Sequence, residues 1–277
     1  MSRGTFPYLE ELQNIQNWDM LQSRTLTSDL IGEVLRFHQR TVSIPTHSVH
    51  NIAGHFEVQQ WISGIRQTDA LPAMPRERIS LNVSRTQFAA SADHFDQEWR
   101  MSVEALGALL YRAFGRDESL HKRYPSAGAL YPILPILCVF GDDAVAGIRP
   151  GAFAFDARSP GLLRLETWLP ERLTTLQEVV CASGAARPSR LAIAYAMDMR
   201  RALTKYRFKG YRHALIEVGL GAQAFREALR EVGEQHGRKF GERCWSDFAD
   251  NALTAACGLD IRLAPITLLQ WFGALSI

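Results

Sequence analysis

The sequence of 277 residues is poor in long apolar runs. It contains no stretch of about 18 consecutive apolar residues, the length that a membrane-spanning helix requires. Acidic and amide side chains also occupy the N-terminal segment, where a secretory signal peptide would need an apolar region. These absences argue against a membrane protein and predict a location in the cytoplasm.

Cysteine is scarce as well, and no CxxC pair is present. The four cysteines are Cys138, Cys181, Cys244 and Cys257. Scattered single cysteines favour reduced, packed thiols over a disulfide framework or a zinc site. His47, His50 and His55 are spaced like metal ligands, but Glu57 is the only acid near them, so we predict no metal site there.

The sequence also lacks an excess of charge of either sign. Its 31 basic and 29 acidic side chains give a formal net charge of +2, which disfavours nucleic acid as a partner. The motifs GxSxG, HExxH and GxxxxGK[ST] are absent. Gly219 and Gly221 form a GxG pattern, but it falls inside a predicted helix and not in the strand-turn-helix setting of a dinucleotide loop.

Hydrophobic residues make up 47% of the chain, enough for a sizeable core. Nearly continuous apolar runs at residues 132–140 and 191–197 predict central strands that are buried on both faces. The segments 151–156 and 162–166 flank a Ser-Pro-Gly turn and predict a hairpin. A last apolar run at 264–273 predicts a strand near the C-terminus.

Three helices are predicted from spacing and caps. One follows Thr27 or Ser28, one runs from Ser102 to Gly115, and the clearest spans about 210–232, where apolar residues recur every three or four positions. Residues 79–88 suggest a short strand or extended arm. The order of elements predicts an α+β fold, with residues 1–75 as a helical N-terminal extension and 76–277 as the main domain.

The segment HKRYPSAGALYP at residues 121–132 precedes a buried strand. Its Pro125, Ser126, Ala127 and Gly128 leave the backbone free to approach a flat ligand closely. The plain alternative is a Pro/Gly turn before a strand.

A second cluster, KYRFKGYR, begins at Lys205. Only four of the 31 basic residues are lysines, so arginine is the default cation of this chain. A lysine in place of arginine suggests a group that must lose its proton, which arginine cannot do. Tyr206 could transfer a proton through its phenol. The alternative is a solvated basic start of a helix, although cations there oppose the helix dipole.

Four segments together resemble the SagB-type dehydrogenases, a branch of the nitroreductase superfamily that includes the dehydrogenase subunits of microcin synthetases. They are RYPSAGALYP (123–132), GAFAFD (151–156), RALTKYRFKGYRHALIEVG (201–219) and CWSDFADNALTAACGLD (244–260). The resemblance covers roughly residues 79–273. It implies a nitroreductase-like α+β fold with a central mixed sheet flanked by helices, in a homodimer with FMN bound at its interface.

The resemblance also implies the site residues. Lys205 and Tyr206 are implied as the catalytic pair. The residues implied to bind the cofactor are Ser84, Arg85, Thr86, Arg123, Pro125, Ser126, Ala127, Gly128, Trp245 and Ser246. In the segment for the FMN phosphate, Asn82 and Thr86 replace the arginines usual in nitroreductases, and Arg85 is the substitute.

The implied activity is the FMN-dependent oxidation of thiazolines and oxazolines in a precursor peptide to thiazoles and oxazoles, with oxygen as the final acceptor. The implied partners are a cyclodehydratase, a leader-binding subunit and the precursor peptide. Two alternatives share the fold: a general NAD(P)H-dependent nitroreductase or flavin reductase, and a non-catalytic scaffold subunit of a peptide-modifying complex.

Overall fold

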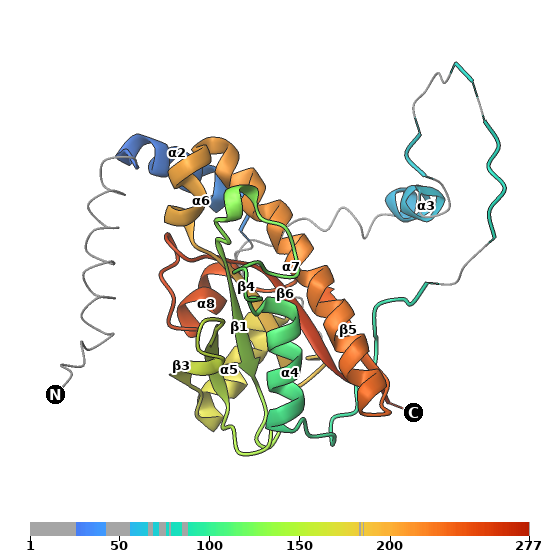
Figure 1. Cartoon of the computed structure of the whole chain (residues 1–277), viewed down its shortest axis with the longest axis vertical. Helices are drawn as coiled ribbons and strands as arrows, with labels where there is room; N and C mark the ends of the chain where they lie inside the picture. The colour runs from blue at the N-terminus through green and yellow to red at the C-terminus, as the bar shows by residue number, and fades with distance from the viewer. Residues whose placement is uncertain are drawn as a thin grey trace. The chain divides into compact units, whose positions relative to one another are not determined.

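A computed structural model describes residues 26–42, 56–65, 69–71, 76–77, 79–84, 88–182, 184 and 186–276 (Figure 1). By their contacts the residues fall into two compact units, one made of residues 44–90 and the other of residues 1–43 and 91–277. The domain boundary predicted at residue 75 stays a prediction.

The described elements follow one another along the chain, with helices and strands interspersed. In order they are α2 (Ser28–Gln39), α3 (Phe56–Ile65), α4 (Val103–Phe114), η2 (Ala127–Ala129), β1 (Ile133–Val139), β2 (Gly151–Asp156), β3 (Gly161–Thr167), α5 (Pro170–Val180), β4 (Leu191–Met197), α6 (Met199–Tyr206), α7 (Phe208–Gln235), β5 (Phe240–Trp245), α8 (Asp250–Ala256) and β6 (Ile266–Ala274). None of the described helices is long and apolar enough to cross a bilayer.

The strands form one six-stranded sheet in the order β3-β2-β1-β4-β6-β5. All its strand pairs are antiparallel, so the mixed sheet implied by the resemblance is wrong for the described strands. The connections from β1 to β2 and from β2 to β3 are too short for the crossover that parallel neighbours require. The α+β class itself is confirmed.

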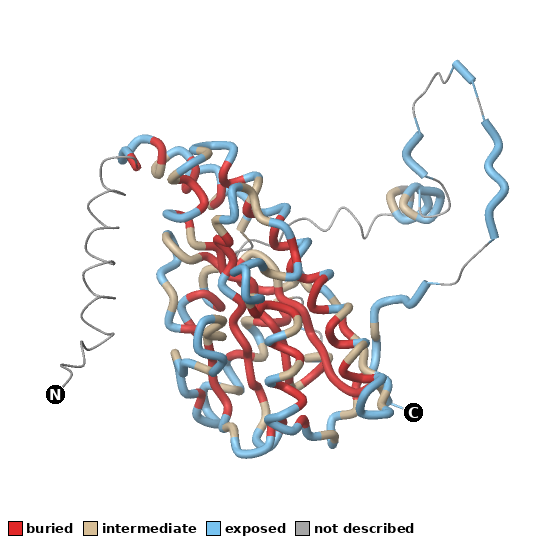
Figure 2. Tube along the Cα trace, in the orientation of Figure 1, coloured by how far each residue is buried: buried red, intermediate tan, exposed pale blue. Residues whose placement is uncertain are grey.

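Strands β1 and β4 are buried on both faces, as their apolar runs predicted (Figure 2). Leu137 and Ile193 enter the core that α4 and α7 cover. Ile136 and Ala194, one residue along each strand, enter a second core that α5 and α8 cover. The sheet therefore separates two hydrophobic layers, because side chains alternate along a strand.

Helix α2 packs against the first core and contributes buried side chains to it. Thr27 caps the helix by accepting a hydrogen bond from the amide of Leu30 at 3.3 Å. Leu30 is buried, and His38 Nδ1 lies 3.1 Å from Tyr211 Oη on α7. Helix α3 belongs to the unit of residues 44–90.

The structure confirms most of the predicted elements. Ser102 caps α4 by accepting from the Ala105 amide at 3.1 Å, and Gly115 ends the helix. The hairpin, α7 and β6 are also present. Residues 79–84 are exposed and form no strand. The sequence analysis did not anticipate α5, α6, β5 and α8, because these short segments have no clear apolar periodicity.

Candidate active site

The Ser-Ala-Gly loop, residues 123–131, has an unusual backbone. Gly128 has a φ of +65°, and Ala129 and Tyr131 adopt φ angles of +54° and +47°. Residues other than glycine rarely adopt this left-handed region, so the conformations of Ala129 and Tyr131 each cost on the order of 1–3 kcal/mol. Ser126 Oγ accepts from the amide of Tyr131 at 2.8 Å and so holds the turn closed. The surroundings therefore impose the shape of this loop.

Lys205 and Tyr206 end helix α6. The helix begins at Asp198, whose side chain accepts from the Arg201 amide at 2.9 Å. Arg207, with φ +51° and ψ −130°, breaks the helix and starts α7. A Cβ on Gly210 would clash with the carbonyl oxygen of Ala202, so α6 and α7 lie in close contact at this corner.

The loop and the Lys-Tyr pair meet at Gly128. A Cβ placed on Gly128 would lie 2.8 Å from Lys205 Nζ and 2.9 Å from Tyr206 Oη. Lys205 Nζ also lies 5.3 Å from the centre of the Tyr206 ring. Lys205 is exposed and Tyr206 is half-buried, so both polar groups are open to a ligand beside the loop. Two motifs that are about 77 residues apart in the sequence thus form one site.

His213 is a site residue that the sequence analysis missed. Its ring packs edge-on against Tyr206, with 4.9 Å between ring centres. Its Nδ1 is buried and has no hydrogen-bond partner. No local signal pointed to His213, because Tyr206 ends α6, His213 lies on α7, and the break at Arg207 separates the two residues.

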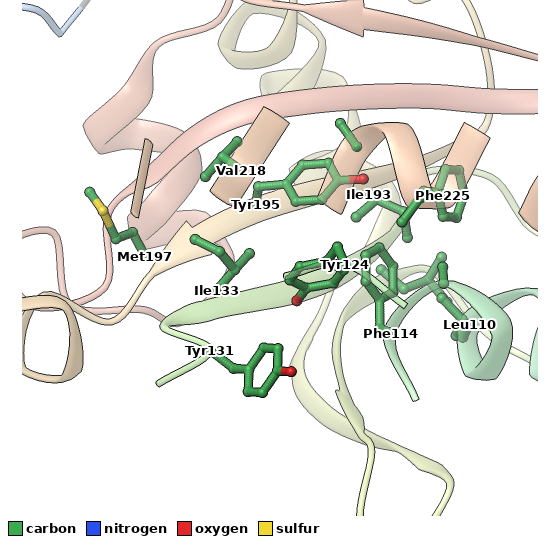
Figure 3. Close-up of a cluster of buried hydrophobic side chains, with 14 of the residues drawn as sticks. Leu110, Phe114, Tyr124, Tyr131, Ile133, Ile193, Tyr195, Met197, Val218 and Phe225 are labelled. Atoms are coloured by element: carbon green, nitrogen blue, oxygen red, sulfur yellow. The ribbon is translucent and has the colours of Figure 1, made fainter. Parts of the chain in front are cut away.

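A buried polar cluster lies against the same loop and was also missed. Glu217 on α7 is 2% exposed and Tyr124 is 3% exposed, and neither Glu217 Oε1 nor Tyr124 Oη has a partner. Figure 3 shows Tyr124 between Tyr195 and Tyr131, and the rings of Tyr124 and Tyr131 are 6.0 Å apart, edge to face. Unpartnered buried polar atoms are rare in folded proteins, so each one requires an explanation.

Burial shifts the pKa values of two groups in this cluster. Burial raises the pKa of Glu217 to about 7, although the Ser126 hydroxyl and the charges of Lys122 and Arg201 act in the opposite direction. Burial, with help from the charge of Arg116, lowers the pKa of Lys122 to about 8. Desolvation disfavours the charged form of each group, which explains the opposite signs.

The structure places the other predicted cofactor residues differently. Arg123 forms a bidentate ion pair with Glu231 on α7, at 2.9 and 2.5 Å, and contacts Glu227 at 3.3 Å. Trp245 Nε1 donates to two backbone carbonyl oxygens, and its ring packs against the second core. No hydrogen bond or ring contact among the described residues joins Trp245 or Ser246 to Gly128. Their cofactor roles stay predictions.

The predicted phosphate segment is only partly described. Ser84 is exposed and lies in the unit of residues 44–90, without regular structure. Arg85 and Thr86 lie outside the described residues, as do His47, His50 and His55. In the described part of the chain, no three metal-ligating side chains come together.

All four cysteines are free thiols. Cys138 and Cys257 are buried with their sulfur atoms 3.9 Å apart, and Cys181 is buried too. Cys244 is exposed, so the prediction of packed thiols is wrong for this residue. It lies on β5, which is an edge strand of the sheet.

No protein-family model matches the chain. Its sequence is 29% identical over 199 residues to the Microcin B17-processing protein McbC of Escherichia coli, and the match covers 70% of each chain. The chain is a homologue of McbC. Its structure matches a chain of the E. coli microcin synthetase McbBCD complex, solved with truncated pro-MccB17 bound. That match has a TM-score of 0.73 and 23% identity, and it covers 92% of this chain and 97% of the other.

A second solved structure supports the fold. A solved structure from Ralstonia eutropha, whose name describes a nitroreductase by similarity, matches with a TM-score of 0.54 and 15% identity, over 75% of this chain and 97% of its own. Together with the McbBCD match, it shows that the chain has a nitroreductase-like fold, as the sequence predicted.

Proposed function

We propose that this chain is an FMN-dependent dehydrogenase that oxidises peptide thiazolines and oxazolines to thiazoles and oxazoles. One observation carries the proposal: the Ser-Ala-Gly loop and the Lys205-Tyr206 pair converge at Gly128 in a homologue of McbC. The nitroreductase-like fold supports the same conclusion.

The residues at this site fit a flavin. Because Gly128 carries no side chain, Lys205 Nζ and Tyr206 Oη lie directly against its backbone, so a flat ring bound beside the loop would be within reach of both groups. The Ser126 hydroxyl already accepts from the Tyr131 amide, so the loop would contact the flavin through its main chain. The buried Nδ1 of His213 is an unpartnered polar atom beside Tyr206. Bound FMN would supply the two-electron acceptor that takes a hydride from the azoline.

The chain itself would supply the base. Conversion of an azoline to an azole removes one hydride and one proton, and the proton goes to Lys205 in its amine form or to Tyr206 in its phenolate form. The fixed geometry of α6 places both groups beside the loop, and such positioning lowers the barrier to proton transfer. Because Lys205 is exposed, water can remove the accepted proton.

We further propose that the chain acts as a homodimer within a heteromeric synthetase that contains a cyclodehydratase and a leader-binding subunit, with a precursor peptide as substrate. The homologue supports the heteromeric synthetase, since the matching solved structure is a McbBCD complex with a truncated pro-MccB17 bound. The homodimer is what the resemblance to SagB-type dehydrogenases implies. The match covers nearly the whole of both chains.

The test begins with the visible spectrum of the purified protein and the mass of the chromophore that it releases. We expect FMN, and we expect the holoprotein with its partner subunits to convert an azoline-containing peptide to a product lighter by two hydrogens per ring. Absence of FMN from a protein that also refuses added FMN would contradict the proposal and favour a scaffold.

A second assay separates the proposal from a general nitroreductase. NADPH is added to the holoprotein under anaerobic conditions, and the flavin absorbance is followed with time. We expect slow bleaching with NADPH and fast bleaching with the azoline peptide. The reverse order would favour a nicotinamide-dependent reductase.

A further inference from the structure

Tyr131, the last residue of the Ser-Ala-Gly loop, is both strained and buried. Its φ angle is +47°, in a region that residues with a large side chain rarely occupy, and the residue is only 5% exposed. A glycine would adopt the same backbone conformation without strain. Strained residues persist where the surrounding structure imposes their conformation, and they are concentrated at functional sites. The presence of a tyrosine at this position therefore requires a reason that lies in its side chain.

Two hydrogen bonds of Tyr131 close the loop on itself. The backbone amide of Lys122, the residue before the loop, donates to Tyr131 Oη at 3.2 Å. The backbone amide of Tyr131 donates to Ser126 Oγ, in the middle of the loop, at 2.8 Å. The last residue of the loop is thereby joined to the start of the loop through its phenol and to the middle through its main chain. We call these two hydrogen bonds the Tyr131 clasp.

Neighbouring side chains hold the phenol in place. The guanidinium carbon of Arg116 lies 4.7 Å from the centre of the Tyr131 ring. The ring of Tyr124 packs against it edge to face, with 6.0 Å between ring centres (Figure 3). Because the ring is fixed from two sides, its hydroxyl group stays in reach of the Lys122 amide.

The end of the loop is also fastened to α6. The carbonyl oxygen of Tyr131 accepts from Arg201 Nη1 at 3.4 Å, and that of Pro132 accepts from the Asp198 amide at 2.8 Å. Arg201 lies about one helical turn before Lys205 on α6. Tyr131 therefore joins the loop to the helix that carries the proposed base.

We propose that Tyr131 is a positioning residue, which closes the Ser-Ala-Gly loop through its phenol and holds Gly128 beside the proposed catalytic pair. Tyr131 does not need to touch the cofactor or the substrate for this role. Its effect on FMN binding rests on the proposed function, since that function defines what Gly128 contacts. Its effect on the loop does not depend on that function.

Hydrogen exchange of the full chain tests the clasp without relying on FMN. Tyr131→Phe removes only the hydroxyl group that accepts from the Lys122 amide. We expect the amides of Lys122 and of residues 124–131 to exchange at least about fivefold faster than in the wild type, whereas those of α4 should not change. Wild-type exchange at Lys122 and in the loop would overturn the inference.

Tyr211→Phe is the matched control. It also removes the hydroxyl group of a buried tyrosine, which lies 3.1 Å from His38 Nδ1 where α7 meets α2. The loop should exchange at the wild-type rate in this variant, and equal acceleration in both variants would overturn the inference. If Tyr131→Phe does not fold, Ser126→Ala removes the acceptor of the Tyr131 amide. It should accelerate exchange in the same segment, and unchanged exchange there would overturn the inference as well.

Two measurements on the bound flavin separate positioning from a loss of stability. Fluorescence titration should give an FMN dissociation constant roughly two- to tenfold higher in Tyr131→Phe, which is the effect of one neutral hydrogen bond. At saturating FMN, the visible circular dichroism of the flavin should change in Tyr131→Phe and match the wild type in Tyr211→Phe. Wild-type affinity together with a wild-type flavin spectrum in Tyr131→Phe would overturn the inference. A wild type that binds no FMN, with faster loop exchange in Tyr131→Phe, would support the clasp and contradict the proposed function alone.

Discussion

At the scale of single residues, two independent features of the structure require glycine at position 128. Its φ of +65° disfavours any side chain, and its surroundings leave no room for a Cβ beside Lys205 Nζ and Tyr206 Oη. Gly147 shares only the first requirement, since its φ is +72° but nothing lies within 4 Å of the position of a Cβ. The two glycines therefore separate backbone strain from crowding.

We expect Gly128→Ala to weaken FMN binding by at least about tenfold, because the methyl group adds crowding to a left-handed strain of about 1–2 kcal/mol. Gly147→Ala carries the same strain and should bind FMN as the wild type does. Fluorescence titration measures both constants. Equal FMN affinity in the two variants would show that Gly128 does not lie against the cofactor.

The second prediction at this scale concerns the base. Lys205→Ala should retain FMN but slow azole formation by roughly 100-fold or more, which is a typical contribution of general base catalysis. Lys209→Ala, which removes an exposed lysine of the same basic cluster, is the control and should keep its activity. Product mass after a timed reaction measures the rate. Unchanged turnover in Lys205→Ala would leave Tyr206 as the candidate, to be tested by Tyr206→Phe.

The third prediction concerns pH and stability. Because the folded pKa of Glu217 lies above its model-peptide value of 4.5, at about 7, Glu217 contributes fully to stability when protonated. This contribution is lost as the pH rises from 4.5 through 7, and it amounts to at most about 3 kcal/mol. Urea unfolding at pH 5 and pH 7.5 should show the loss in the wild type and a smaller loss in Glu217→Gln. An equal loss in both proteins would assign the pH dependence to other groups.

At the scale of elements, the corner between α6 and α7 positions Lys205 and Tyr206, the proposed catalytic pair. Arg207 interrupts the helix in an unfavourable conformation, and Gly210 allows α7 to pass directly over the Ala202 carbonyl oxygen. The approach of the two helices fixes the end of α6, where Lys205 and Tyr206 lie. Gly210 thus determines the geometry of Lys205 and Tyr206, the two residues that we propose as catalytic.

Gly210→Ala should lower the free energy of unfolding by about 2 kcal/mol or more, because the added methyl forces α6 away from α7. Gly219→Ala on the same helix is the matched control, since nothing lies within 4 Å of the Cβ position there. Alanine favours a helix over glycine by about 1 kcal/mol, so the control should be neutral or more stable. Urea unfolding of both variants measures the difference, and equal stabilities would show that this corner tolerates a side chain.

At the scale of the whole molecule, one sheet separates two cores, and all the residues of the candidate site that the structure brings together lie on the side of α6 and α7. A ligand bound there should stabilise the folded state by mass action. FMN at one hundred times its dissociation constant should add about 2.7 kcal/mol to the free energy of unfolding. Thermal denaturation with and without FMN measures the shift, and Gly128→Ala at the same FMN concentration should shift less.

The sequence by itself determined the elements whose signals are local. The continuous apolar runs of β1 and β4 predicted buried strands, and Ser102 and Gly115 predicted the ends of α4, because hydrophobic periodicity and capping depend only on near neighbours. Resemblance in the segments around Ser126 and Lys205 predicted the fold that the solved structures support.

Only the tertiary structure decided which distant residues meet. Lys205 Nζ and Tyr206 Oη lie beside Gly128, and the ring of His213 packs against Tyr206. No local pattern contains these contacts, because they depend on how α6 and α7 pack against the loop that leads into β1. The antiparallel direction of every strand pair was decided in the same way, since pairing depends on the path of the whole chain between strands.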